Sequence, residues 1–191
     1  MVGVAAVMSG TLVGRGYREG VALFSRRRRM PDTDRARLEL RPGDAILVST
    51  ALSDDRWVVA TKEALHVLAP DAPVDRHPWS DVDHGSLDSA TRTLTLRWVW
   101  GQTATLTFSE GPASVVFAQT FRERVQQSVV HAVATTLPGG QRVRVALRRG
   151  EDGTMFTQVL GDATVDLSDP AVAALVDAAE DEVRDAVGLP R

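Results

Sequence analysis

The chain has 191 residues, of which 43% are apolar, and a formal net charge of −3. This composition is typical of a folded globular protein and argues against a chain that is disordered throughout. Cysteine is absent, which excludes disulfide scaffolds, thiolate zinc sites, iron–sulfur ligation and a cysteine nucleophile. No window approaches the ~18 consecutive apolar residues of a membrane-spanning helix. The apolar run at residues 2–14 lacks a basic leader, so we expect no signal peptide and a cytoplasmic location.

Residues 1–43 are predicted to form a flexible basic arm, because they show no sustained hydrophobic periodicity and are rich in glycine at first. The arm should lead into a short helical or irregular entry that ends at the turn Arg41-Pro42-Gly43-Asp44. The glycines follow no strand and lack the spacing of a phosphate-binding loop. The arm carries four consecutive arginines, Arg26, Arg27, Arg28 and Arg29. They are a candidate site for an anionic membrane surface or another polyanion. The competing interpretation is a solvated stretch, or one that folds back on the acidic residues 150–191.

From Asp44 onwards the pattern predicts short strands separated by turn signals, at residues 45–52, 56–61 and 64–69. Residues 93–100 and 103–108 alternate with a period of two and are joined by Gly101-Gln102, which predicts a hairpin. One face of its first strand should meet a core; that face carries Leu94, Leu96, Trp98 and Trp100. After Gly111-Pro112 the period becomes helical, and Phe117, Phe121, Val125 and Val129 predict an amphipathic helix of about three turns.

A second unit follows, with three predicted antiparallel strands at residues 129–137, 142–149 and 154–161. A helix then begins with Asp169 as N-cap and Pro170 at its first position. Its apolar stripe should pack on one face of the sheet; the stripe consists of Val172, Leu175, Val176, Ala179, Val183 and Val187. The middle strand places three arginines on one face, namely Arg142, Arg144 and Arg148. If exposed, they form a basic stripe that an acidic partner could bind, unless the acidic helix of the same chain neutralises it.

The order of seven short strands followed by an amphipathic helix resembles a bacterial pleckstrin-homology-like (PH-like) domain. The resemblance covers residues 44–130 and is carried by RWVVATKEALHVL, HPWSDVDHGSLD, TLTLRWVW, TATLTF and FAQTFRERV. The stretches ALRRG, FTQVLGD and VDLSDPAVAALVDAAE are similar to uncharacterised actinobacterial proteins of this architecture. The expected fold is α+β: a PH-like small β-barrel or sandwich capped by a helix (44–130), then a three-stranded antiparallel sheet with a C-terminal helix (131–191).

The PH-like resemblance implies a scaffold that is not catalytic and that binds phosphoinositides in some members and proteins or peptides in others. Lipid-binding members usually place several basic residues in the loop between the first two strands. Here this loop, residues 52–56, contains Asp54 and Asp55. Carboxylates repel phosphate, so the resemblance favours protein recognition.

The segment RHPWSDVDHG contains two histidines and two aspartates and is a candidate metal or catalytic site. In one extended strand, His77 and Asp81 would share a face while His84 would point the other way. A metal site needs three or four convergent donors, so we interpret the segment as structural and assign no catalytic, metal or cofactor residue. Ser86, near His84 and Asp88, lacks the context of an activated nucleophile.

The leading hypothesis is a non-enzymatic interaction protein that binds a protein or peptide partner through a groove or an edge of the PH-like sheet. The alternative is a peripheral binder of anionic membrane or another polyanion through the arginine arm. Nucleic acid is a weaker candidate, because no aromatic stacking platform adjoins the arginine run. A metal-dependent hydrolase using His77, Asp81 or His84 is a third and weaker hypothesis. The sequence leaves the oligomeric state open.

Overall fold

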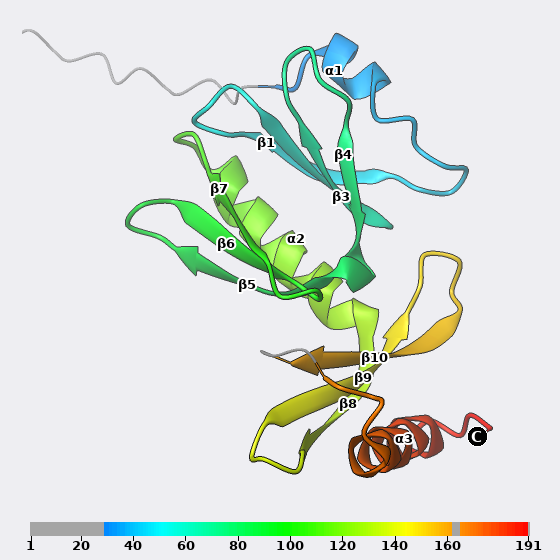
Figure 1. The fold of residues 1–191 in the computed structure, drawn as a ribbon. Helices are drawn as coiled ribbons and strands as arrows, with labels where there is room; N and C mark the ends of the chain where they lie inside the picture. The colour runs from blue at the N-terminus through cyan, green and yellow to red at the C-terminus, as the bar shows by residue number, and fades with distance from the viewer. Residues whose placement is uncertain (1–28, 162–164, 191) are drawn as a thin grey trace, which may run out of the picture.

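The computed structural model describes residues 29–161 and 165–190, which form an α+β fold with three antiparallel sheets (Figure 1). A short helix, α1 (Asp32–Ala36), precedes the first sheet. That sheet has the order β1-β2-β3-β4 and contains β1 (Ile46–Ala51), β2 (Trp57–Thr61), β3 (Ala64–Leu68) and β4 (Asp75–Pro78). The second has the order β5-β6-β7 and contains β5 (Val82–Asp88), β6 (Thr93–Trp98) and β7 (Thr103–Thr107). No helix in the described ranges has the length and apolar character needed to cross a membrane.

The first two sheets share one core with helix α2 (Ala113–Ser128). Phe117, Phe121 and Val125 lie on the buried face of α2, as their spacing predicts. At one corner the sheets adjoin: Leu52 forms a bridge with Phe108, and the Ser53 amide donates to the Thr107 carbonyl at 2.9 Å. The sheets do not close into a barrel, so the barrel form of the prediction is wrong while the helix-covered arrangement of two sheets is observed.

The predicted hairpin of the second sheet is confirmed, with a longer turn. Leu94, Leu96 and Trp98 point into the core, and β6 pairs with β7 in register. The turn spans residues 99–102, because the Trp98 amide donates to the Gln102 carbonyl at 2.8 Å and Gly101 adopts a positive φ of 90°. Trp100 therefore lies in the turn and is 52% exposed, stacked on Trp98 with ring centroids 5.4 Å apart.

A single strand through residues 77–84 is not observed. β4 ends at Pro78, a 3-10 turn occupies Trp79–Asp81, and β5 begins at Val82. A straight strand would point Trp79 and Val82 to opposite faces. The turn instead brings both side chains into the core and carries the chain from the first sheet to the second. The Trp79 indole also donates to the Thr61 carbonyl at 3.1 Å, which fixes this corner.

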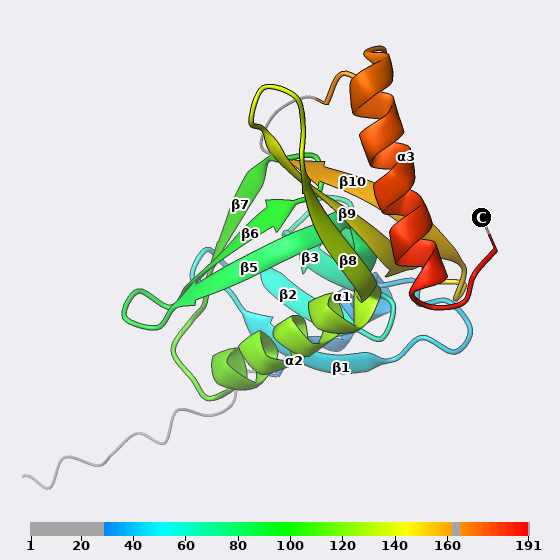
Figure 2. The ribbon, with the colours of Figure 1, turned by 90° about the horizontal axis from the view of Figure 1, so that it is seen from below.

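The third sheet and its helix match the predicted β-β-β-α order. The sheet has the order β10-β9-β8 and contains β8 (Val129–Thr136), β9 (Arg142–Arg149) and β10 (Met155–Gly161). Helix α3 (Pro170–Asp185) lies along one face of it (Figure 2). The Asp169 carboxylate accepts a hydrogen bond from the Ala171 amide at 2.8 Å, so the predicted N-cap is confirmed. The buried stripe of α3 consists of Val172, Val176, Ala179 and Val183.

The other face of the third sheet packs against the first part of the chain. Helix α2 ends at Ser128 and β8 begins at Val129, so no linker separates the two units. Arg148 of β9 is fully buried and donates from Nη1 to the Val82 carbonyl and to Ser128 Oγ, both at 3.0 Å. The three sheets therefore meet at the start of β5 and the end of α2.

Candidate functional site

A groove of about 680 Å³ runs between β5 and α2, and we call it the β5–α2 groove. β5 is an outer strand of its sheet, paired with β6 alone among the described strands. Its remaining edge thus offers backbone amide and carbonyl groups beside the helix. Half of the lining residues have apolar side chains, namely Leu87, Leu94, Val115, Ala118, Phe121, Val125 and Val129.

The mouth of the groove exposes apolar side chains from both walls. Leu87 of β5 is 41% exposed and Val115 of α2 is 59% exposed. Polar groups lie along the same groove, with Asp83 and His84 from the start of β5 and Arg122 from the helix. A concave surface that combines apolar side chains with polar groups is the usual character of a site that binds a ligand or a partner segment.

Gly85 determines how closely α2 approaches β5. A Cβ atom at this position would lie 2.5 Å from Cε1 of Phe121, so the ring occupies the space that a side chain would need. A glycine inside a strand commonly marks such a close approach. Sequence reasoning missed Gly85 as part of a site, although its place within the predicted strand of HPWSDVDHGSLD was the available signal.

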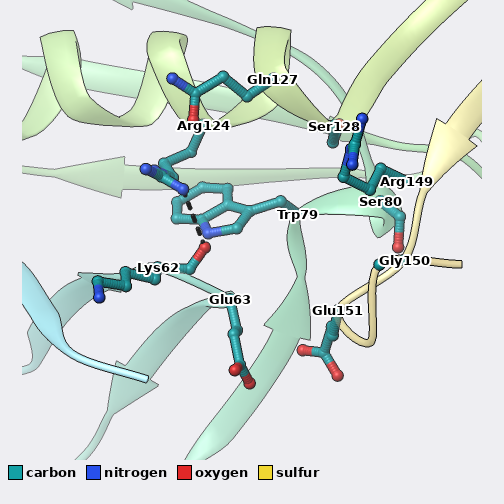
Figure 3. A pocket seen from close by; sticks show the side chains of 11 residues that line it. Lys62, Glu63, Trp79, Ser80, Arg124, Gln127, Ser128, Arg149, Gly150 and Glu151 are labelled. Carbon is teal, nitrogen blue, oxygen red and sulfur yellow. Dashed lines mark hydrogen bonds between the residues drawn. The ribbon is translucent and has the colours of Figure 1, made fainter. Parts of the chain in front are cut away.

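A second concavity of about 450 Å³ lies where the first sheet, α2 and the β9–β10 turn meet, and we call it the junction pocket (Figure 3). Trp79 lines its centre. Three basic side chains surround it, Lys62, Arg124 and Arg149. It shares no lining residue with the β5–α2 groove. Its residues come from four distant parts of the sequence, which explains why no local motif predicted it.

Two acidic residues of the junction pocket are engaged by arginines outside it. Glu151 in the β9–β10 turn forms ion pairs with Arg76 and with Arg41, the latter at 2.7 Å. Glu63 lies 3.7 Å from the Arg76 guanidinium. These contacts also attach the turn of the third sheet to the first sheet.

The predicted basic stripe of β9 is only partly exposed. Arg142 and Arg144 are exposed, and Arg144 pairs with Asp83. Arg148 is buried, so its inclusion in an exposed stripe is wrong. Arg148 is buried because this face of the third sheet packs against β5 and α2. The alternation of polar and apolar residues within β9 does not show that another part of the chain covers this face. Burial lowers the pKa of the Arg148 guanidinium, while the nearby Asp83 carboxylate opposes this effect.

The arginine run of the N-terminal arm falls mainly outside the described residues. Arg29 is described and exposed, whereas Arg26, Arg27 and Arg28 are not described.

The histidines and aspartates of RHPWSDVDHG do not converge on one point. His77 Nε2 lies 3.0 Å from Asp75, and its ring packs on Trp98 at a centroid distance of 4.3 Å. His84 pairs instead with Asp83 at 3.0 Å. Burial raises the pKa of the Asp81 carboxyl. Within residues 29–161 and 165–190 there is no group of three or more His, Cys, Asp or Glu side chains placed to hold a metal ion.

The loop between β1 and β2 is acidic and internally paired. Asp54 and Arg56 form an ion pair at 2.7 Å, and the hydrogen bond from Arg56 holds the pKa of the Asp54 carboxyl below its ordinary value. The one arginine of this loop is thus already bound to a carboxylate. No protein-family model, curated protein or solved structure matches the chain.

Proposed function

We propose that the chain is a non-enzymatic interaction protein, built on a PH-like scaffold, that binds an extended peptide segment of a protein partner in the β5–α2 groove. The observation that supports this proposal is that the open edge of β5 and the apolar side chains of α2 face one groove of about 680 Å³. Such an edge can accept a further strand, whose main chain contributes affinity while side-chain pockets contribute specificity.

The PH-like scaffold is supported by the element order of four strands, three strands and a covering helix. The bridge between Leu52 and Phe108 supports it further, because it joins the two sheets at one corner. The paired, acidic β1–β2 loop supports a protein partner over a phosphoinositide. The absence of cysteine from the sequence is consistent with a cytoplasmic protein.

The chemistry of the groove constrains the partner segment. Side chains alternate along a strand, so every second residue of a paired peptide would face the apolar groove wall. We therefore expect the partner to supply an extended segment with apolar residues two apart. Proline should be absent wherever its missing amide would interrupt pairing with β5.

A selection from a random peptide display library tests this proposal. Peptides enriched on the full chain are synthesised, and their Kd values are measured by fluorescence anisotropy for the wild type, Val115→Arg and Val116→Arg. The two valines are neighbours on α2 with similar exposure, 59% and 51%, but only Val115 lines the groove. The Val115→Arg variant should lose at least tenfold in affinity, because burying an unpaired guanidinium is costly. The Val116→Arg variant should bind normally.

Equal binding by both variants, or enrichment of peptides without alternating apolar residues, would refute the groove as the recognition site. The competing function, binding of an anionic membrane or another polyanion through Arg26, Arg27, Arg28 and Arg29, predicts a different result. Under that function the full chain co-sediments with anionic vesicles at low salt and is released at physiological salt. A variant with the four arginines replaced by glutamine would then stay in solution.

A further inference from the structure

The junction pocket gathers three basic side chains that have no acidic partner among the described residues. Lys62 comes from the turn between β2 and β3, Arg124 from the last turns of α2, and Arg149 from the end of β9 (Figure 3). None of the three forms an ion pair within residues 29–161 and 165–190; the one side-chain hydrogen bond of Arg124 goes to the Lys62 carbonyl at 3.2 Å. Three cations that line one pocket from separate elements produce a positive local potential.

The two acids of the pocket do not outweigh this potential, because arginines outside the pocket lie beside them. Arg76 contacts both Glu63 and Glu151, and Arg41 contacts Glu151 from outside the pocket. In Figure 3 the carboxylates of Glu63 and Glu151 lie in the lower part of the view, whereas the Arg149 guanidinium lies in its upper part. Glu151 is thus bound by two arginines, whereas Glu63 has only the 3.7 Å contact with Arg76 and its Oε2 has no hydrogen-bond partner within the described residues.

A neutral donor completes the basic side of the pocket. Ser80 lines the pocket, is 8% exposed, and its hydroxyl makes no hydrogen bond within the described residues. The neighbouring Ser128 hydroxyl is already used, since it donates to the Val125 carbonyl and accepts from Arg148. The Ser80 hydroxyl therefore remains free to bind an incoming oxygen atom.

We propose that the junction pocket is a binding site for a small molecule carrying a phosphate group, with Arg124, Arg149 and Lys62 as its cationic ligands and Ser80 as a hydrogen-bond donor. Guanidinium groups bind phosphate oxygens through charge-assisted hydrogen bonds, and lysine adds a compact point charge. A volume of about 450 Å³ fits a small organic phosphate. This site is separate from the β5–α2 groove and does not depend on the peptide function.

The chain offers a direct reporter, because Lys62 is its only lysine. Reductive methylation with ¹³C-formaldehyde labels Lys62, and otherwise only the N-terminal amine, without removing the charge. Inorganic phosphate is titrated into the labelled protein at constant ionic strength, with sodium chloride in exchange. The Lys62 methyl signal should shift along a saturable curve. Arg124→Gln and Arg149→Gln should each weaken binding about tenfold, whereas Arg35→Gln on α1 should leave it unchanged.

Two further titrations define the ligand class. A phosphomonoester such as phosphoserine should bind at least as tightly as inorganic phosphate if the site accepts organic phosphates. Citrate should bind more weakly. A linear shift of the Lys62 signal, the same affinity in Arg149→Gln as in Arg35→Gln, or tighter binding of citrate than of either phosphate would overturn the proposal. Arg149 is exposed, so its variant should fold normally, and an amide spectrum of each variant verifies that it does.

Discussion

Nη1 of Arg148 lies 3.0 Å from the carbonyl oxygen of Val82, across the boundary between the third sheet and the second. The same nitrogen donates to Ser128 Oγ, whereas Nε and Nη2 have no hydrogen-bond partner within the described residues. Burying a guanidinium costs free energy, and its two hydrogen bonds and the nearby carboxylates of Asp81 and Asp83 offset that cost. Substitutions of Arg148 measure whether these interactions outweigh the cost of burying the guanidinium.

Arg148→Ala should lower the free energy of unfolding by about 2–4 kcal/mol, since it leaves a cavity and removes the hydrogen-bond donor of the Val82 carbonyl and of Ser128 Oγ. Arg148→Met fills most of the space and should lose only about 1–2 kcal/mol. Urea unfolding followed by tryptophan fluorescence measures both values. Arg142→Met, at an exposed position on the same strand, is the control and should change stability by no more than about 0.5 kcal/mol. A methionine variant as stable as the wild type would mean that desolvation outweighs the hydrogen bonds.

Gly85→Ala should destabilise the protein by about 1–3 kcal/mol, because its methyl group would overlap the Phe121 ring. The same change in a Phe121→Leu background should cost less, because the ring that it meets is gone. Thermal unfolding of the four proteins of this cycle measures the coupling. If the cost is equal in both backgrounds, the close approach of α2 to β5 is not what requires glycine.

The buried imidazole of His66 should make stability fall in mild acid. Desolvation lowers the pKa of His66 to about 4 from an ordinary value of 6.5. Between these values the unfolded chain takes up a proton that the folded chain excludes, so the free energy of unfolding decreases as the pH falls. The loss should reach about 3 kcal/mol at pH 4. Urea unfolding of the wild type and His66→Gln at several pH values isolates this contribution. If the free energies of unfolding of the two proteins change with pH in the same way, the pKa of His66 is not lowered in the folded protein.

Asp169→Ala should cost about 1 kcal/mol, because the carboxylate that accepts the Ala171 amide hydrogen at the start of α3 is lost. Asp177→Ala, in the middle of the same helix, should cost less than about 0.5 kcal/mol. Unfolding in guanidinium chloride measures the free energy of unfolding of both variants. A loss from Asp177→Ala as large as that from Asp169→Ala would assign the effect to helix charge in general.

Local patterns in the sequence predicted the elements that depend on neighbours in the chain. The alternation of Leu94, Leu96 and Trp98 predicted the hairpin, and the pair Asp169-Pro170 predicted the start of α3. These signals hold because the period of a strand and the chemistry of a cap are set within a few residues.

What the sequence did not reveal depends on contacts between distant segments. Arg148 follows the alternation of an exposed strand face, yet that face is covered by β5 and α2. The turn at Trp79–Asp81 places Trp79 and Val82, three residues apart, in the same core. The local pattern does not show that both positions face that core, so it could not predict the turn. The β5–α2 groove and the junction pocket arise only when segments far apart in sequence meet.

The direct continuation of α2 into β8 couples the two units mechanically. The helix that forms one wall of the β5–α2 groove passes at Ser128 into the first strand of the third sheet without a hinge residue between them. A peptide that displaced α2 would therefore also move β8 and, with it, the third sheet and the acidic outer surface of α3. Any rotation of α2 that the irregular pairing at Val129–His131 did not absorb would reorient the third sheet and act on the contacts of Arg148 and Glu151 that attach that sheet.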